Sequence, residues 1–422
     1  MRNPETELLR KLFDVAVTAA DPMQVIPRIL PEKPSGRVVV IGAGKASARM
    51  AEAVESVWGP CEGLVLTRYG YARQTQGIEI VEAAHPVSDA AGLDVTNRLL
   101  ELLQGLKEDD FVLALISGGG SALLCAPAGE LTLSDKQAVY RGLLESGAPI
   151  GKMNVVRKHL SRVKGGQLAA AAYPATMLCL LISDVPGDDP ADIASGATVG
   201  EMSSSADARA IIDEYNIPLP SSARNLLKQS GFVVAPDDER LSRTTNTVIS
   251  APSQSLEAAR VQAKSMGYDA RILGDAIEGE ARSEATRQIA LAREIQDELE
   301  PGAIPVVLLS GGECTVSGWG GGVGGPNAEF ALAAAIALDG QAGIYLMACD
   351  TDGVDGAAEV AGAIVQPDTL ARAQALGLDP QDYLTRSDSH IFFGELDDQV
   401  VTGPTLTNVN DFRAILINPK GD

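Results

Sequence analysis

The sequence has little cysteine for its length and no paired CxxC motif. The five cysteines are widely spaced along the 422 residues: Cys61, Cys125, Cys179, Cys314 and Cys349. An odd number at such spacing argues against a disulfide framework or a zinc site, and for a reducing compartment. We therefore expect buried structural thiols.

Basic residues are also scarce relative to acids. Lys and Arg together number 34 against 56 for Asp and Glu, which gives a formal net charge of −22. A chain this acidic repels nucleic acid and anionic membrane surfaces, so neither is an expected partner. A small anion needs a local cluster of donors to overcome that field, which makes any basic cluster in this sequence informative.

Long apolar runs are missing. The longest strongly apolar stretches, such as "MLCLLI", have the length of a strand and fall far short of the ~20 residues of a membrane span. We do not expect the N-terminal segment to be a signal peptide, because Asp14 interrupts its apolar part. We expect a soluble, cytoplasmic protein. The sequence does not fix the oligomeric state, and a homodimer is one option.

Regularly alternating segments make up the first half of the chain. Apolar runs ("RVVVIG", "GLVLTR", "IEIVEA", "FVLALISG", "MLCLLISD") alternate with helical patterns at 46–58, 88–105, 134–146 and 154–172. Continuous apolar strands that alternate with helices indicate a parallel sheet covered on both faces. We expect a Rossmann-like, three-layer α/β domain whose site is built by the loops at the carboxyl ends of the strands.

A second alternation begins after a polar, proline-containing stretch. We place the boundary near 235, which gives an N-terminal domain at 1–235 and a smaller C-terminal α/β domain with a mixed sheet at 236–422. Its expected strands are "TVIS", "DARIL", "IPVVLLSGGE", "GIYLMACD" and "AILINP", and a long amphipathic helix at 280–299 separates two of them. Because each half has an apolar strand that ends in Ser-Gly-Gly, we expect the active site in a cleft between the domains.

The first glycine-rich loop, "GAGKAS", departs from a dinucleotide fingerprint. Ser47 stands where the third glycine is required, and the second strand ends in Thr67 and Arg68 instead of an acid for the ribose diol. NAD is therefore disfavoured. Arg68 could meet a 2′-phosphate, which leaves NADP open.

The same loop also departs from a Walker ATP loop. Val39 stands at the position of the first glycine and Ala46 at the position of the Ser or Thr. What remains is a turn through Gly42 and Gly44 with Lys45 at a helix N-terminus. Backbone N–H groups and an ammonium there form an anion site, although a tight turn with a solvated lysine is the plainer alternative.

The second loop, "SGGGSALL", carries three successive glycines. Gly118, Gly119 and Gly120 would let the backbone approach a ligand closely. Ser117 and Ser121 flank them, and Ser121 could cap the following helix or bind a phosphate oxygen. A purely structural turn is the alternative.

A basic segment follows at 151–171. Five cations crowd this short stretch of an acidic chain: Lys152, Arg157, Lys158, Arg162 and Lys164. A basic helix end would bind carboxylate or phosphate, with Arg favoured for its bidentate fork. A solvated basic face is the alternative, and His159 is expected to be structural.

The third loop, "SDVPGDDPADIASG", carries aspartates after an apolar strand. Asp184, Asp188 and Asp189 could hold Mg²⁺ with its waters or accept a proton from a hydroxyl. Acids also cap turns, which is the structural alternative. A further acidic stretch, "DTDGVDG", lacks the spacing of a calcium loop.

Taken together, these motifs resemble the bacterial and archaeal glycerate 2-kinases, whose C-terminal domain is often called MOFRL. The matching pieces include "GAGKAS", "AAHPV", "SGGGSALL", "NVVRKHLSRVKGGQLA", "ISDVPGDDPADIASG", "LLSGGE", "GGPNAEF", "DTDGVDG" and "TGPTLTNVNDF", in family order from about 5 to 417. The resemblance implies ATP-dependent phosphorylation of D-glycerate at its 2-hydroxyl, with Mg²⁺ or another divalent cation. An NADP-dependent hydroxypyruvate reductase is the second hypothesis, and a non-catalytic sugar-acid or nucleotide binding protein is the third.

The resemblance also implies roles for individual residues. Lys45 matches the family's active-site lysine, and we expect an arginine of the 157–162 segment, Arg157 or Arg162, to hold the glycerate carboxylate while a carboxylate accepts the 2-hydroxyl proton. Further nucleotide- or substrate-binding candidates lie in the matching motifs: Gly42, Gly44, Ser47, Ser117, Gly118, Gly119, Gly120, Ser121, Arg162, Lys164, Gly311, Gly312, Glu313, Asn327, Glu329, Asp352, Asp355 and Asn408.

Two departures from the family pattern stand out. Val323 and Pro326 occupy positions where we expect a second basic residue near "NAEF", and Ala197 replaces an expected proline. Either Arg157 or Arg162 compensates for the missing charge, or the affinity for phosphate is reduced.

Overall fold

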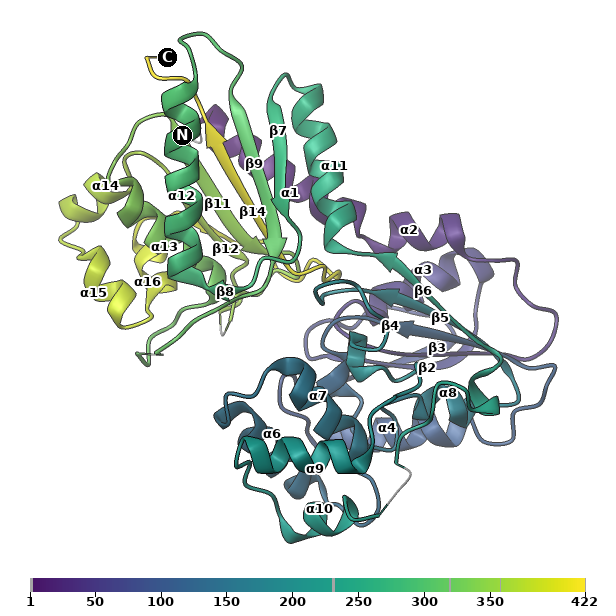
Figure 1. Cartoon of the computed structure of the whole chain (residues 1–422). Coiled ribbons are helices and arrows are strands. Elements are labelled where there is room, and N and C mark those ends of the chain that lie inside the picture. Colours follow the sequence, from purple (N-terminus) through teal and green to yellow (C-terminus); the bar gives the residue numbers. More distant parts are fainter. Residues whose placement is uncertain (1–2, 230–231, 319, 357, 422) are drawn as a thin grey trace. The chain divides into compact units, whose positions relative to one another are not determined.

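The chain folds into two compact units in the computed structural model, which describes residues 3–229, 232–318, 320–356 and 358–421 (Figure 1). One unit spans 22–249. The other joins the first 21 residues to 250–422 and is called the 250–422 unit below.

The 22–249 unit is built on a sheet of order β3-β2-β1-β4-β5-β6. Its strands in the described part of the chain are β1 (Val38–Ala43), β2 (Glu62–Arg68), β3 (Ile78–Ala83), β4 (Phe111–Ile116), β5 (Thr176–Ile182) and β6 (Thr244–Ser250). β1 pairs in parallel with β2 and β4, β2 with β3, and β4 with β5. This confirms the predicted parallel sheet.

Helices cover both faces of this sheet. A central strand such as β1 is therefore buried along its whole length. Figure 1 shows α2 (Pro22–Ile29) and α3 (Ser47–Trp58) on one face, and α4 (Ala90–Leu102) and α8 (Gln167–Ala172) on the other. Alternate apolar residues of β1, β4 and β5 pack with α4 and α8 in one core.

A separate helical cluster belongs to the same unit. It has its own apolar core, and consists of α6 (Leu133–Glu145), α7 (Ile150–His159), α9 (Ser205–Glu214) and α10 (Ser221–Leu226). Three short helices complete the unit: α5 (Gly120–Leu123), η1 (Ile193–Ser195) and η2 (Glu239–Leu241).

The 250–422 unit has a mixed sheet of order β13-β12-β11-β14-β9-β7. Only β7 and β9 pair in parallel, and the other neighbours are antiparallel. The strands are β7 (Asp269–Gly274), β9 (Val306–Gly312), β11 (Ile344–Asp350), β12 (Gly362–Val365), β13 (Gln399–Val400) and β14 (Asp411–Ile417), with a separate ladder of β8 (Gly279–Glu280) and β10 (Cys314–Thr315).

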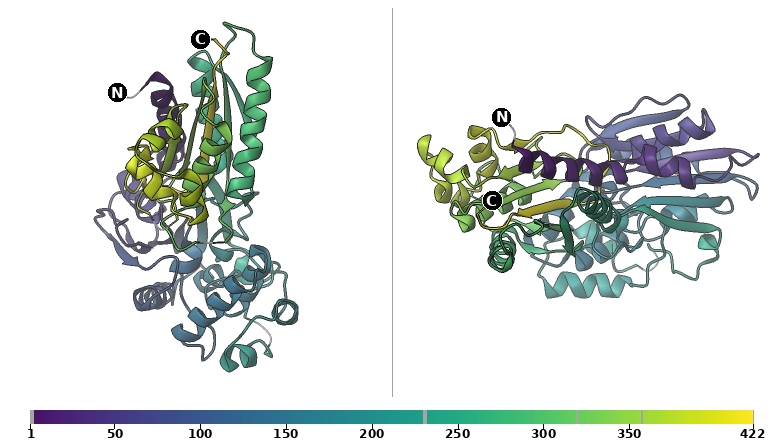
Figure 2. Two further views of the ribbon diagram at one scale, coloured as in Figure 1. Left: turned by 90° about the vertical axis from the view of Figure 1, so that its left-hand side faces the viewer. Right: turned by 90° about the horizontal axis from the view of Figure 1, so that it is seen from above.

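Among the described residues, two helices cover one face of the mixed sheet and five cover the other. α1 (Pro4–Ala19) and α11 (Pro252–Ser265) share one apolar core with the sheet, and Figure 2 shows α1 running alongside it. The opposite face carries α12 (Ala281–Glu298), α13 (Pro326–Leu338), α14 (Thr369–Ala375), α15 (Pro380–Thr385) and α16 (Ser389–Glu395).

Four expectations about the elements need correction. The segment "TVIS" lies in β6 of the first sheet, and the two units divide at 249/250 instead of 235. The first 21 residues pack with the second unit because the apolar face of α1 lies on its sheet. The predicted helix at 154–172 is two helices: α7 ends at His159, and α8 begins at Gln167 directly after Gly165 and Gly166, which take positive φ values of 55° and 79°.

All five cysteines are buried and free, as expected. Within the described residues, no helix combines the length and the apolar character that crossing a bilayer requires.

Candidate active site

The turn after β1 is locked onto the end of β4. A methyl group at Gly44, where φ is 147°, would lie 2.1 Å from Ser117 Oγ, so only glycine fits. The Ala46 N–H donates to Ser117 Oγ at 3.0 Å, and the Lys45 N–H donates to the Gly118 carbonyl at 2.8 Å. The first two glycine-rich loops therefore form one joined rim at the carboxyl end of the sheet.

Two candidate serines, Ser47 and Ser117, support this rim from the buried side. Ser47 and Ser117 are fully buried, and the Ser47 hydroxyl donates to the Leu115 carbonyl at 2.8 Å. Gly42 is required here too, because a methyl group on it would lie 2.6 Å from the same carbonyl oxygen. The structure gives these three residues a part in positioning the loops.

Lys45 crosses over the triple-glycine loop beside His85. A methyl group at Gly119 would lie 3.2 Å from Lys45 Cγ and 3.1 Å from His85 Nε2. Gly119 has φ of 80°, so the backbone favours glycine there, and an added methyl group would also press on the Lys45 and His85 side chains. The lysine stem thus lies on the loop that was predicted to approach a phosphate.

A pocket opens at the other end of the same loop. The space between its walls is about 570 Å³ when the solvent open to it is counted, and about 40 Å³ of it is free for the centre of a water-sized molecule. Its walls are formed by Pro86, Val87, Ser88, Ser121, Ala122, Leu131, Lys136, Gln137, Val139, Tyr140, Arg157, Leu160 and Lys164. Three of these residues are cations and none is an Asp or Glu, in a chain of net charge −22.

Lys164 is the most deeply buried of the three cations. Its side chain is 1% exposed, and Nζ donates to the Ser121 carbonyl at 2.7 Å. Burial lowers the pKa of Lys164 well below its ordinary value, and the charges of Lys136 and Arg157 lower it further. The positive charges of Lys136 and Arg157 thus disfavour a third positive charge, that of Lys164, in this pocket.

The other two cations are held by neutral partners. Arg157 lies over the ring of Tyr140, 5.5 Å from its centroid, and donates to Asn154 Oδ1 at 3.3 Å. Lys136 Nζ donates to Ser88 Oγ at 3.4 Å. Burial lowers the pKa of both Arg157 and Lys136.

The rest of the basic segment has other partners. Lys158 forms a buried ion pair with Glu201, with Nζ and Oε2 2.6 Å apart. Arg162 donates to Asn97 Oδ1 at 2.5 Å and to the Pro127 carbonyl at 3.1 Å, and it does not line the pocket. Of the two arginines proposed for the substrate carboxylate, only Arg157 faces the pocket.

The aspartate loop packs against the same rim. Ser195 Oγ lies 2.6 Å from Ser121 Oγ. Asp188 has φ of 55°, and its buried Oδ1 has no hydrogen-bond partner. Asp189 Oδ1 accepts from the Ala191 N–H, as in a capped turn.

No group of three or more His, Cys, Asp or Glu in the described ranges is placed to hold a metal ion. The unpartnered Asp188 oxygen fits a divalent cation that is held by one or two carboxylates and by water. The loop at 184–189 therefore remains the candidate metal site.

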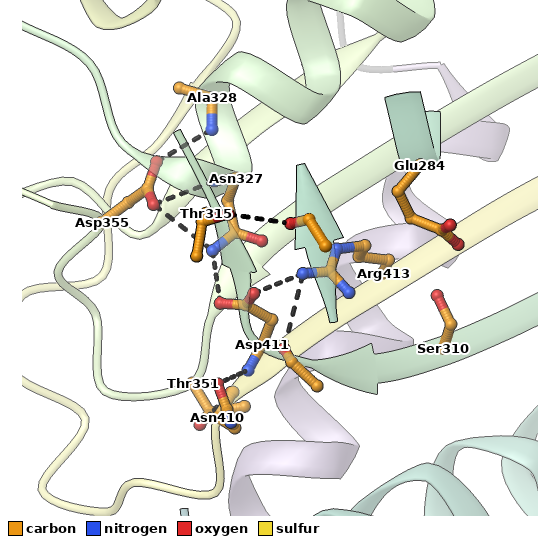
Figure 3. A network of polar contacts seen from close by, with 12 residues as sticks. Glu284, Ser310, Thr315, Asn327, Ala328, Thr351, Asp355, Asn410, Asp411 and Arg413 are labelled. Carbon is orange, nitrogen blue, oxygen red and sulfur yellow. Dashed lines mark hydrogen bonds and ion pairs between the residues drawn. The ribbon is translucent and has the colours of Figure 1, made fainter. Parts of the chain in front are cut away.

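In the 250–422 unit, other candidates meet in a buried polar network (Figure 3). The Asp355 carboxylate accepts from the backbone N–H groups of Asn327 and Ala328, at 3.0 and 2.8 Å. It thereby caps the N-terminus of α13. The Asn327 side chain donates to Asp411 Oδ1 at 2.6 Å, and Asp411 pairs with the fully buried Arg413.

The carboxyl group of Asp411 has a raised pKa in this network. Burial raises its pKa to about 7, and Asp355 adds repulsion, while Arg413 and Asn327 oppose the shift. The rise is large because the carboxyl group is cut off from water, and Arg413 stabilises its ionised form only in part.

The remaining candidates of this unit are also engaged within the protein. Glu329 is buried and lies 3.0 Å from Arg282, and Asp352 Oδ1 accepts from the Val354 N–H at 2.8 Å. Asn408 Oδ1 accepts from the Asn410 N–H at 3.3 Å. A methyl group at Gly312 would lie 2.2 Å from Ile277 N.

The last candidates of this unit lie in or beside its glycine-rich stretches. Glu313 is exposed, while a methyl group at Gly311 would lie 3.2 Å from the Asp411 carbonyl. Pro326 is the first residue of α13, and the exposed Val323 donates its N–H to Asp388 Oδ1. Neither supplies the second positive charge that the family pattern leads one to expect.

Sequence reasoning missed three residues that share this rim and pocket: His85, Lys136 and Tyr140. The motif "AAHPV" was a signal for His85. Lys136 and Tyr140 lie on α6 in an ordinary helical pattern. Only the folded chain brings them to Arg157 and Lys164.

Comparison with known proteins identifies the family. Residues 8–228 match a family described as a domain of unknown function, DUF4147, and 306–411 match the MOFRL family. A D-glycerate 2-kinase from Thermotoga maritima is 38% identical, with 99% of this chain and 100% of that protein covered.

A second curated relative carries a different name. It comes from Agrobacterium vitis, is provisionally named a hydroxypyruvate reductase, and is 50% identical over 97% of this chain and 94% of its own length. The crystal structure of the Thermotoga glycerate kinase superposes with a TM-score of 0.86 at 36% identity, covering 98% of this chain and 100% of that one. On these matches, the chain belongs to the glycerate 2-kinase family whose members carry a MOFRL domain.

Proposed function

We propose that this enzyme transfers the terminal phosphoryl group of ATP to the 2-hydroxyl of D-glycerate, giving 2-phosphoglycerate and ADP. The observation that carries the proposal is the joined rim of glycine-rich loops, with Lys45 at one end and a three-cation pocket at the other. Both substrates are anions, and a chain at −22 needs such a local field to bind them. The names of the kinase relatives support the same reaction.

The proposed roles follow from position. Lys45 neutralises charge on the transferring phosphoryl group, and the backbone at Gly118, Gly119 and Gly120 lies along the phosphates. Arg157 grips the glycerate carboxylate, because its fork suits a bidentate contact and Tyr140 already orients it. Phosphoryl transfer depends mainly on positioning and electrostatics, so no covalent nucleophile is required.

The aspartate loop is the proposed metal-binding element. Asp184, Asp188 and Asp189 would hold Mg²⁺, which would offset phosphate charge when bound. A carboxylate of this loop is the proposed acceptor of the 2-hydroxyl proton. The unpartnered Asp188 oxygen supports this assignment.

The five buried, free thiols fit a reducing compartment, so we propose that the enzyme acts in the cytoplasm.

A reductase is the second candidate, because the Agrobacterium relative bears that name. Two features oppose it. Ser47, in place of the third fingerprint glycine, is bonded to the strand below, and Arg68 lies over the ring of Tyr71, 5.1 Å from its centroid.

Two assays separate the candidates. ADP release should depend on D-glycerate, ATP and Mg²⁺ together, and NADPH should not be oxidised in the presence of hydroxypyruvate. NADPH oxidation without glycerate-dependent ADP release would replace the kinase with the reductase.

A further inference from the structure

The three cations of the pocket raise a problem of charge. Lys136 on α6, Arg157 on α7 and Lys164 between α7 and α8 share one pocket that contains no acidic side chain. Three cations in so confined a space repel one another strongly, because the surroundings screen them poorly. An arrangement of this kind is stable with an anion inside it, or with one of the cations uncharged.

Lys164 is the group that can lose its charge. It is 1% exposed and donates a hydrogen bond to a neutral carbonyl, that of Ser121. The other groups that act on it are Lys136, Arg157, Cys125 and Lys158, and Lys158 is already paired with Glu201. Burial lowers the pKa of Lys164 most; of these four groups Lys136, Arg157 and Lys158 lower it further and Cys125 raises it, so the cations dominate around Lys164.

We infer that Lys136, Arg157 and Lys164 form one oxyanion subsite, and that an anion entering it is bound together with a proton that Lys164 takes up from solution. The proton moves from solvent to the free electron pair of Lys164 Nζ, and no bond of the ligand changes. The occupant is a carboxylate or a phosphate group; that it belongs to glycerate or ATP rests on the proposed function.

Polar contacts connect the subsite to the joined rim of glycine-rich loops. Lys164 bonds to the Ser121 carbonyl, and the Ser121 hydroxyl lies 2.6 Å from that of Ser195. Ser195 Oγ in turn lies 3.4 Å from Asn154 Oδ1, the acceptor of the Arg157 guanidinium. An anion on Arg157 and Lys164 would therefore sit against the end of the glycine-rich loop.

The pH dependence of binding follows from the proton balance. An anion raises the pKa of Lys164 from its depressed value, which burial and the neighbouring cations cause in the empty pocket. The bound state then holds more protons than the free state between those two pKa values. Affinity should fall as pH rises through that window.

The test measures protons directly. The full-length protein, in weakly buffered solution with a pH indicator, is mixed with D-glycerate or with inorganic tripolyphosphate adjusted to the same pH. We expect the pH to rise on binding, with uptake approaching one proton per chain. Uptake with glycerate assigns the subsite to the substrate carboxylate, and uptake with tripolyphosphate alone assigns it to the nucleotide. Binding of both without uptake overturns the inference.

Variants check that Lys164 is the acceptor. Lys164→Met should abolish uptake, weaken anion binding at least tenfold and raise the unfolding temperature, whereas a merely structural lysine would lower that temperature. Lys164→Arg keeps a permanent charge and should bind without uptake. Lys152→Met is the matched control, because Lys152 is exposed in the same segment and outside the pocket. Persistent uptake in Lys164→Met would exclude Lys164.

Failure of the inference differs from failure of the proposed function. Proton-coupled glycerate binding without phosphorylation would leave the subsite standing and remove the kinase reaction. Phosphorylation with proton-free binding would do the opposite.

Discussion

Lys45 is the residue whose loss should separate catalysis from folding. Its backbone N–H binds the Gly118 carbonyl, and that bond survives truncation of the side chain. Lys45→Ala should lower turnover about 10²- to 10³-fold, or ~3–4 kcal/mol of transition-state stabilisation, with little change in unfolding temperature. Steady-state kinetics and thermal unfolding of the same preparation provide the check. A stable variant with more than half of wild-type activity would remove Lys45 from the mechanism.

Arg157 and Arg162 form a matched pair for testing the carboxylate contact. Arg157→Lys keeps the charge in the pocket but loses the bidentate fork, so the KM for glycerate should rise at least tenfold, or about 1.4 kcal/mol. The KM for ATP should change much less. Arg162→Lys is the control, since Arg162 bonds to Asn97 outside the pocket. Equal effects of the two variants would show that the segment acts only through its overall charge.

Asp411 should make the fold less stable as pH rises. Its pKa, 3.8 in the unfolded chain, is about 7 in the buried network, so the folded state binds more protons between these values. The contribution of Asp411 is fully present below about pH 4 and is lost as pH rises through 7. Urea unfolding at several pH values should therefore show Asp411→Asn gaining stability relative to the wild type as pH rises. A shift in the opposite direction would mean that Arg413 keeps Asp411 ionised.

At the scale of elements, apolar runs and glycine clusters predicted the first sheet and its loops well. Five strands appear where the apolar runs lie, because a strand that is buried on both faces is apolar at nearly every position. The segment "TVIS" was misplaced because an edge strand and the first strand of a new domain look the same locally. Which sheet it joins depends on pairing with β5.

Gly44 tests whether the two glycine-rich loops act as one element. Gly44→Ala places a methyl group 2.1 Å from Ser117 Oγ, which must push the loops apart. Activity should fall at least tenfold while the rest of the fold persists. The control is Gly147→Ala, at φ of 68° and with no atom within 4 Å of the added methyl group. It incurs the backbone strain of a left-handed alanine without a clash, and similar losses in both variants would refute the coupling of the loops.

At the scale of the whole molecule, net charge pointed to the basic segment but could not predict which other residues line the pocket. The charge of −22 drew attention to the basic segment, of which Arg157 and Lys164 do reach a pocket. Lys136 could not be predicted, because it lies 21 positions from Arg157 and joins it only through the packing of α6 and α7. Two arginines lie near Val323 and Pro326 in the described part of the chain, and both are paired: Arg282 with Glu329, and Arg386 with Asp382 and Asp388.

The central claim is the transfer of phosphate to the 2-hydroxyl of glycerate. Phosphorus NMR of the purified protein with ATP, Mg²⁺ and D-glycerate tests it most directly, because the two phosphoglycerate isomers give distinct resonances. We predict loss of the terminal phosphate signal of ATP with matching growth of 2-phosphoglycerate and ADP. Accumulation of 3-phosphoglycerate, or ATP left intact while hydroxypyruvate is reduced with NADPH, would contradict it.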